Sequence, residues 1–118
     1  MYVLTDGRPV WAVYRTLPAI EFIENTAIEF NKSQDSTTIN NKYRSVNKDI
    51  FVVFGGCPDV QEIPEYYPNK GFVCPENGAL FDTAGRPLNN VSKGQPMAIP
   101  KHYFKDKMTL VVYANQDG

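Results

Sequence analysis

Proline interrupts the middle of the chain at short intervals, and this feature limits the fold more than any other. Residues 57–87 contain five prolines, Pro58, Pro64, Pro68, Pro75 and Pro87. Proline has no backbone N–H and breaks a helix interior, so this spacing favours turns and short strands over helices. The short apolar runs that remain, Gly71-Phe72-Val73 and Ala79-Leu80-Phe81-Asp82, are typical of short strands between turns.

The flanking segments have clearer periodicity. Tyr2–Thr16 predicts a β-hairpin, and residues 18–32 have the apolar spacing of an amphipathic helix that begins at a proline. Ser33–Asn47 is polar and predicts a loop. Asp49–Phe54 and Met108–Tyr113 are apolar, β-rich runs that predict strands. We therefore expect one mostly β domain with one helix.

Composition excludes several functional classes. The chain has 118 residues, the size of one ordinary domain, with Lys+Arg 12 against Asp+Glu 13 and a net charge of −1. This balance gives no electrostatic case for binding nucleic acid or an anionic membrane. Because no apolar run approaches the length of a spanning helix and no signal-peptide pattern is visible, we expect a soluble domain without a transmembrane segment.

The two cysteines lie in turn-rich segments, and each is followed at a short interval by a side-chain oxygen. The pattern is Cys57-x-Asp59, fourteen intervening residues after Asp59, and Cys74-x-x-Asn77. Two cysteines are compatible with one disulfide, a pair of metal ligands or two inert buried thiols, and the spacing alone does not choose among them.

Ordered blocks along nearly the whole chain resemble the soluble head of the Rieske iron–sulfur subunit of cytochrome bc complexes. The most specific block is Cys74-Pro75-x-x-Gly78-x-x-Phe81-Asp82-x-x-Gly85-Arg86, which is similar to the family's second ligand loop and the turn after it. The run from Gly7 to Thr16 is similar to the strand before the family's helix, and Lys93-Gly94-Gln95-Pro96 to its proline-containing loop. The cysteine frame matches the Rieske spacing Cys-x-His and Cys-x-x-His.

The resemblance implies an antiparallel, β-sandwich-like base with a small inserted cluster-binding subdomain. Residues 1–54 and 88–118 would form the base, and residues 55–87 the subdomain. The cofactor-binding positions would be Cys57, Asp59, Cys74 and Asn77. A Rieske [2Fe–2S] cluster uses two thiolates and two imidazoles, so the thiolates are retained whereas Asp59 and Asn77 replace the imidazoles.

Further departures fall in the same subdomain. Glu62 and Glu76 occupy the positions of the cysteines whose disulfide joins the family's two loops. Ala79 and Phe81 occupy positions where high-potential members carry hydroxyl groups that donate to the cluster. The sole histidine, His102, falls beyond the proline-containing loop, and we expect an ordinary histidine rather than a ligand.

These departures lead to three hypotheses about the site. We expect first a Rieske-fold domain without a functional cluster, which serves as a structural or interaction module and is not an enzyme on its own. In that case Cys57 and Cys74 would form a disulfide in an oxidising compartment. The second hypothesis is an atypical [2Fe–2S] electron-transfer subunit of a quinol-oxidising or related complex of a respiratory chain, with Cys57 and Cys74 supplemented by oxygen ligands. The third is zinc bound by Cys57, Cys74 and Asp59, to which Glu62 and Glu76 could contribute.

The resemblance also implies a partner and a location. The partner would be a membrane-associated protein complex, on the periplasmic or intermembrane-space side of an energy-transducing membrane. If docking is retained, the surface would include Pro58, Val60, Tyr66 and Tyr67, in and near the first ligand loop.

Overall fold

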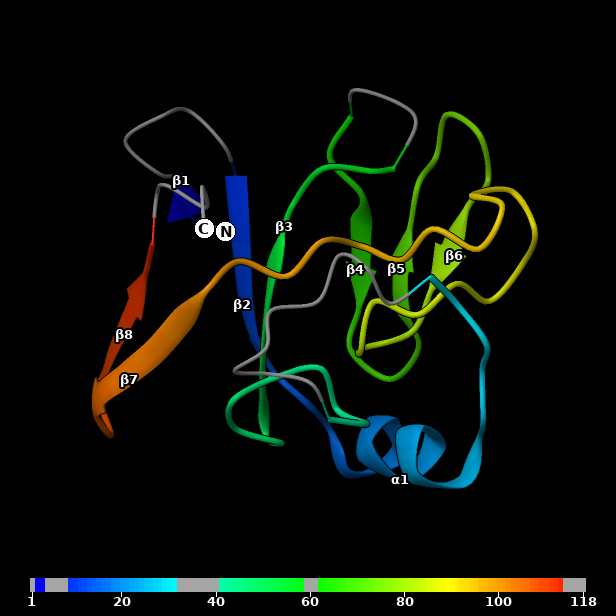
Figure 1. The fold of residues 1–118 in the computed structure, drawn as a ribbon. Coiled ribbons are helices and arrows are strands. Elements are labelled where there is room, and N and C mark those ends of the chain that lie inside the picture. The colour runs from blue at the N-terminus through cyan, green and yellow to red at the C-terminus, as the bar shows by residue number, and fades with distance from the viewer. Residues whose placement is uncertain (1, 4–8, 32–40, 59–61, 114–118) are drawn as a thin grey trace.

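The computed structural model describes residues 2–3, 9–31, 41–58 and 62–113. Its described elements are eight strands and one helix, and every strand pairing among them is antiparallel. The strands form two three-stranded sheets and one two-stranded hairpin. In Figure 1 the two larger sheets lie side by side, the helix lies below them, and the hairpin near the C-terminus lies at the left. The predicted fold class, mostly β with one helix, is confirmed.

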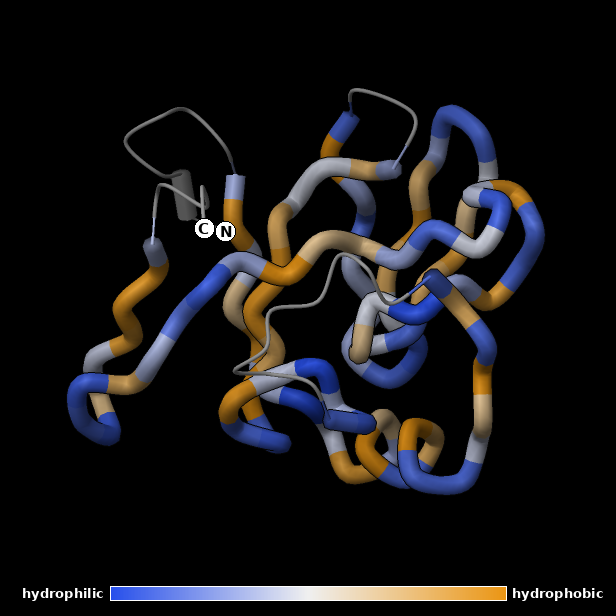
Figure 2. Tube along the Cα trace, viewed as in Figure 1, coloured by the Kyte–Doolittle hydropathy of each residue, from blue (hydrophilic) through white to orange (hydrophobic). Residues whose placement is uncertain are grey.

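The first sheet has the order β1 (Tyr2–Val3), β2 (Pro9–Tyr14), β3 (Ile50–Phe54). The three central residues of β3 are buried because the strand is covered on both faces, as its continuous apolar run predicts. In Figure 2 this strand is hydrophobic along most of its length. The strand β3 therefore forms a central wall of the core and leads directly to Cys57.

The second sheet has the order β4 (Glu65–Tyr67), β5 (Gly71–Val73), β6 (Leu80–Phe81). Gly71 adopts φ +124°, and a Cβ there would lie 2.0 Å from the carbonyl oxygen of Phe81. Only glycine allows this close approach of two backbones. The short strands between prolines are thus held in one sheet, and Cys74 follows β5.

The third pairing is the hairpin of β7 (His102–Asp106) and β8 (Thr109–Val112). The strand predicted for Met108–Tyr113 is confirmed. The segment before this hairpin joins β3 to the turn after β6, because the Met97 amide donates to the Gly85 carbonyl at 2.9 Å and the Phe54 amide donates to the Ala98 carbonyl at 2.9 Å.

The helix α1 (Leu17–Asn25) begins as predicted and ends early. The Thr16 hydroxyl accepts from the Ala19 amide at 3.2 Å, which caps the N-terminus, and Pro18 lies in the first turn. The prediction that the helix continues to about residue 32 is wrong. Thr26 is extended, and its carbonyl accepts from the Arg86 guanidinium at 2.8 Å. A contact with a residue sixty positions later thus replaces the next helical turn.

The main hydrophobic core joins the two three-stranded sheets. Phe51 and Phe72 approach with ring centroids 6.1 Å apart, and both cysteines belong to the same buried cluster. The core therefore extends directly beneath the two cysteine loops. The proposed division into a base and a 55–87 subdomain remains a prediction, although β4–β6 all fall within that range. No helix in the described part of the chain has the length and hydropathy needed to cross a bilayer.

Candidate functional site

The structure joins Cys57 and Cys74 by a disulfide whose Cα atoms are 6.1 Å apart. Cys57 follows β3 after two glycines, and Cys74 directly follows β5, so the bond links the ends of strands from different sheets. Cys57 is 6% exposed and Cys74 is fully buried. The residues at the two thiolate positions of the Rieske frame are therefore brought together, as one covalent link between the loops.

A second link joins the same two loops through Glu62 and Glu76. The Cys57 amide donates to the Glu62 carbonyl at 3.0 Å, which closes the first loop. The Glu62 carboxylate then accepts from the Glu76 amide at 2.7 Å, which connects the first loop to the second. In the family a disulfide occupies these two positions. Here a carboxylate-to-amide hydrogen bond makes the corresponding connection.

Asn77 uses its side chain within its own turn. Its Oδ1 accepts from the Ala79 amide at 3.0 Å, while the Gly78 amide donates to the Cys74 carbonyl at 2.8 Å. This is the local side-chain-to-backbone bond that asparagine makes in turns. The predicted ligand oxygen of Asn77 thus shapes the loop around Cys74. The other two predicted positions of the first loop, Asp59 and Val60, lie outside the described residues.

Three aromatic rings cover the core beside the disulfide. Tyr66 and Phe72 have ring centroids 5.0 Å apart, and Trp11 lies 6.0 Å from Tyr66. Burial raises the pKa of the Tyr66 phenol, with a smaller opposing effect of the Arg15 charge. Tyr67 alternates to the other face of β4, is 45% exposed, and donates its hydroxyl proton to the Glu65 carboxylate at 2.6 Å. Of the predicted docking residues, Tyr66 therefore packs inward, Tyr67 faces solvent and Pro58 is half-buried.

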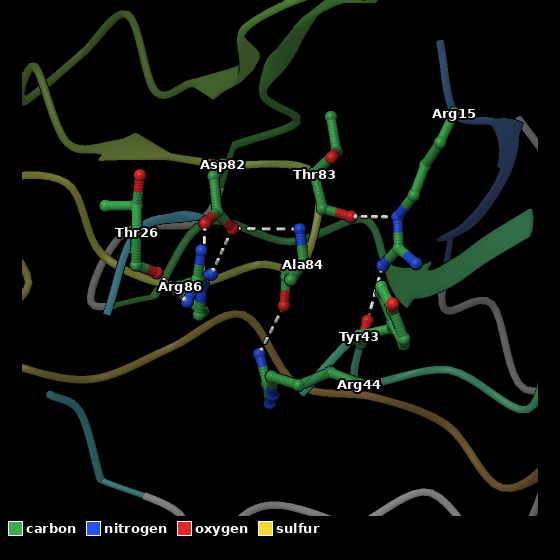
Figure 3. A network of polar contacts seen from close by, with 8 residues as sticks. All are labelled: Arg15, Thr26, Tyr43, Arg44, Asp82, Thr83, Ala84 and Arg86. Carbon is green, nitrogen blue, oxygen red and sulfur yellow. Dashed lines mark hydrogen bonds and ion pairs between the residues drawn. The ribbon is translucent and has the colours of Figure 1, made fainter. Parts of the chain in front are cut away.

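The turn after the second cysteine loop is organised by a buried ion pair, shown in Figure 3. One oxygen of Asp82 accepts from the amides of Ala84 and Arg86 at 2.8 and 3.0 Å, and the other pairs with the Arg86 Nε at 2.7 Å. Asp82 is 1% exposed and Arg86 is 5% exposed. The Asp82-x-x-Gly85-Arg86 block of the sequence is thus explained by a self-contained turn in which one carboxylate orders three donors.

Arg15 holds the same turn from the side of β2. Its guanidinium donates to the carbonyls of Thr83 at 2.9 Å, Lys48 at 2.8 Å and Tyr43, and to the Ser45 hydroxyl at 3.1 Å. Burial lowers the pKa of Arg15 to about 10, against the opposing effect of the Asp82 charge. The side chain remains a cation at neutral pH and ties the turn to the loop that precedes β3.

Arg44 completes the network and was missed by sequence reasoning. Its guanidinium donates to the carbonyls of Ala84 at 2.9 Å and Met97 at 3.0 Å and lies over the Phe30 ring at 5.1 Å. The residue is 1% exposed although it lies in a segment whose composition predicts a loop. In the sequence, Arg44 is a single arginine within a polar segment. Such a pattern does not indicate whether the arginine is buried or exposed to solvent.

The described residues offer one group of metal-ligating side chains. Single donor atoms of Cys57, Glu62 and Cys74 all lie within 4.8 Å of one another. Asn77 is directed elsewhere by its bond to Ala79, and His102 lies on β7 with its Nδ1 2.9 Å from the Pro100 carbonyl. Burial lowers the pKa of His102, which favours a neutral structural imidazole.

The paired cysteine loops and the antiparallel sheets beneath them are consistent with the Rieske-like head domain that the sequence resembles. Comparison with curated proteins confirms the resemblance seen in the sequence. The chain is similar to the ubiquinol-cytochrome c reductase iron-sulfur subunit of Allochromatium vinosum, with 28% identity over 122 aligned positions that include 90% of this chain. The chain spans 59% of the length of that relative. No protein-family model matches the sequence.

The residues present do not fit the cluster that this class implies. A Rieske cluster needs two thiolates on one iron and two imidazoles on the other. The chain has one histidine, and it lies on β7 bonded to its own backbone. Among the residues that the structure describes, the donor group of the site instead consists of two sulfurs and one carboxylate oxygen. We therefore derive no chemistry through a Rieske cluster in this domain.

Proposed function

We propose that this protein is a Rieske-fold structural or interaction module in which protein-internal links replace the cluster. The observation that supports it best is the double connection between the ligand loops. Cys57 is bonded to Cys74, and the Glu62 carboxylate accepts from the Glu76 amide at 2.7 Å. A domain retained for its shape needs these loops fixed, and both links fix them without iron.

The scaffold around the loops is consistent with such a role. The Asp82–Arg86 pair and the guanidinium of Arg15 hold the turn that follows the second loop. Two buried strands, β3 and β5, present the cysteines at the same end of the core. The module would occupy the place of an iron–sulfur head without performing its redox step, and it would not be an enzyme on its own.

The partner we propose is a protein subunit of a membrane-associated complex. The relative is named as a subunit of ubiquinol-cytochrome c reductase. Docking would use Pro58 and Val60 of the first loop and the exposed ring of Tyr67, and Tyr66, which packs inward, would support this surface rather than contact the partner. A disulfide persists in oxidising compartments, so we place the domain on the periplasmic or intermembrane-space side of the membrane.

The second function to be weighed is electron transfer by an atypical [2Fe–2S] centre on Cys57 and Cys74 with oxygen ligands. The proximity of Glu62 to both sulfurs is the observation in its favour. An added carboxylate ligand would make such a centre more negative than a Rieske centre and lower its potential.

Protein purified without oxygen separates the two functions. The module predicts a colourless protein that contains no stoichiometric iron or sulfide, and one that stays colourless after anaerobic reconstitution. Iron and sulfide in stoichiometric amounts, with visible absorption, would refute the module and support the electron-transfer protein.

A further inference from the structure

Beside the disulfide lies a third potential metal ligand, Glu62, which is not one of the four ligand positions of the Rieske pattern. One carboxylate oxygen of Glu62 lies within 4.8 Å of both cysteine sulfurs. Glu62 falls where the family has a loop-linking cysteine, so this donor is a property of this chain. We propose that the site has a second state: after reduction of the disulfide, Cys57, Cys74 and Glu62 bind one divalent cation of the Zn²⁺ class. The inference rests on the disulfide of the proposed function and adds a state to the same site.

The geometry suits zinc once the sulfurs separate. Zinc–thiolate bonds are about 2.3 Å long, so two thiolates on one tetrahedral zinc lie about 3.8 Å apart. The Cα atoms of Cys57 and Cys74 are 6.1 Å apart, which leaves room for this sulfur separation without moving either strand. Three protein donors leave a fourth position for water or for a ligand from a partner, as in open zinc sites.

Glu62 is already oriented for this role. The Glu76 amide donates to Glu62 Oε1 at 2.7 Å, and the Cys57 amide donates to the Glu62 carbonyl at 3.0 Å. Hydrogen bonds of this kind fix the direction of a metal-ligating carboxylate before the ion arrives. Glu62 is half-buried, so the carboxylate lies at the edge of the core and accessible to a cation from solvent.

Charge explains why the reduced site favours a cation. A disulfide is neutral and contributes no thiolate ligand, whereas the two thiols of the reduced site become thiolates as the metal binds and, with the carboxylate, place negative charge next to the core. A divalent cation compensates that charge, and its thiolate and carboxylate preferences match this donor set.

The chemical step is balanced by a dithiol. A dithiol reductant supplies two electrons and two protons, the Cys57–Cys74 bond breaks to give two thiols, and the reductant becomes a disulfide. Zn²⁺ then displaces the two thiol protons to solvent as the metal–sulfur bonds form.

The direct test uses the 118-residue chain in both redox states. Protein is reduced with dithiothreitol, freed of reductant under nitrogen and titrated with Zn²⁺ by calorimetry. A parallel titration with Co²⁺ follows thiolate-to-metal charge-transfer absorption. We expect one equivalent of either ion to bind the reduced protein, with sulfur-ligated cobalt spectra, and no comparable binding to the disulfide form. A reduced protein that binds no Zn²⁺, or a disulfide form that binds it equally well, would overturn the proposal.

A matched pair of variants tests the third ligand without removing the buried cysteines. Glu62→Gln keeps an oxygen for the Glu76 amide but loses the carboxylate, and we expect the Zn²⁺ affinity of the reduced protein to fall by more than about tenfold. Glu76→Gln should leave the affinity unchanged, because Glu76 contributes its backbone N–H. Circular dichroism verifies that both variants are folded. Equal affinities of Glu62→Gln and wild type would overturn the assignment of Glu62. Iron analysis of the purified protein tests the proposed function separately.

Discussion

The Asp82–Arg86 turn and the two cysteine loops adjoin in the chain, yet they are held by different interactions. The turn is buried and fixed by an ion pair together with hydrogen bonds from the guanidinium groups of Arg15 and Arg44. The loops meet at the rim of the core and are fixed by one disulfide and one carboxylate-to-amide bond. Pro75, Glu76 and Gly78 of the loop between β5 and β6 are exposed, whereas every residue of the turn from Asp82 to Pro87 is buried.

The contrast indicates which part of the Rieske-like frame this chain retains. The turn keeps the family's Asp-x-x-Gly-Arg block, and each of its residues has a packing or bonding role that is independent of iron. The loops keep only the two thiolate positions and place carboxylates and an amide where the family has other groups. The interactions that hold the turn and those that hold the loops are therefore separate, and substitutions in the two regions should have different consequences.

The largest effect is expected from the buried ion pair of the turn. Asp82→Ala leaves the Arg86 cation buried without its carboxylate, so we expect the free energy of unfolding to fall by about 3–5 kcal/mol. Urea denaturation measures the change. Glu21→Ala, at an exposed position of α1, is the matched control and should stay within about 0.5 kcal/mol of wild type. Equal stability of the two variants would show that the buried ion pair does not hold the turn.

The disulfide should give the next largest effect. Replacing Cys57 and Cys74 together with alanine removes a link between residues 17 positions apart and should lower the free energy of unfolding by about 3 kcal/mol. Reduction of the wild-type protein without added metal should lower its urea midpoint in the same direction. A double variant as stable as the oxidised wild type would show that the loops do not depend on the covalent link.

The carboxylate-to-amide bond should contribute less. Glu62→Ala removes the acceptor of the Glu76 amide in a half-exposed place, and we expect a loss of about 1 kcal/mol in urea denaturation. Glu76→Ala retains the backbone donor and serves as the control, with an expected change near zero. Equal losses in the two variants would show that side-chain charge, rather than this bond, connects the loops.

The smallest effect concerns His102, which lies outside both regions. Burial lowers its pKa below the ordinary value of 6.5, so the unfolded chain binds the proton more tightly than the folded protein. Stability that is present above pH 6.5 should therefore decrease as pH falls below it, toward the lowered pKa of the folded state. Urea midpoints measured across this range should fall less steeply for His102→Asn than for wild type. Parallel pH profiles would contradict a buried neutral imidazole.

Local patterns predicted those parts of the fold that local interactions determine. The apolar run at β3 and the proline spacing around β5 and β6 predicted strands because burial and the missing proline N–H act within a few residues. The end of α1 was not predictable in this way, since Thr26 bonds to Arg86 across 60 positions. Arg44 was missed for the same reason, because Ala84 and Met97 accept from it 40 and 53 positions later.

The candidate site likewise has some features that the local sequence predicts and others that depend on distant contacts. The two cysteine positions and the substitution of both imidazoles could be read from spacing and resemblance. Glu62 was predicted only as a possible contributor to a zinc site, because its contacts with Cys57, Cys74 and the Glu76 amide depend on how two loops from different sheets meet. Asn77 was predicted as a ligand position from its offset, whereas its Oδ1 accepts from the Ala79 amide of the same turn.

The most direct measurement of the central claim is thiol trapping of natively purified protein. Protein is denatured in an alkylating reagent without reductant and weighed by mass spectrometry. Covalent replacement of the cluster predicts no added alkyl group, and two alkyl groups only after prior reduction. Two alkylated cysteines in the unreduced sample would show that Cys57 and Cys74 are free thiols or metal ligands in the native protein, and would contradict the claim that their disulfide links the loops.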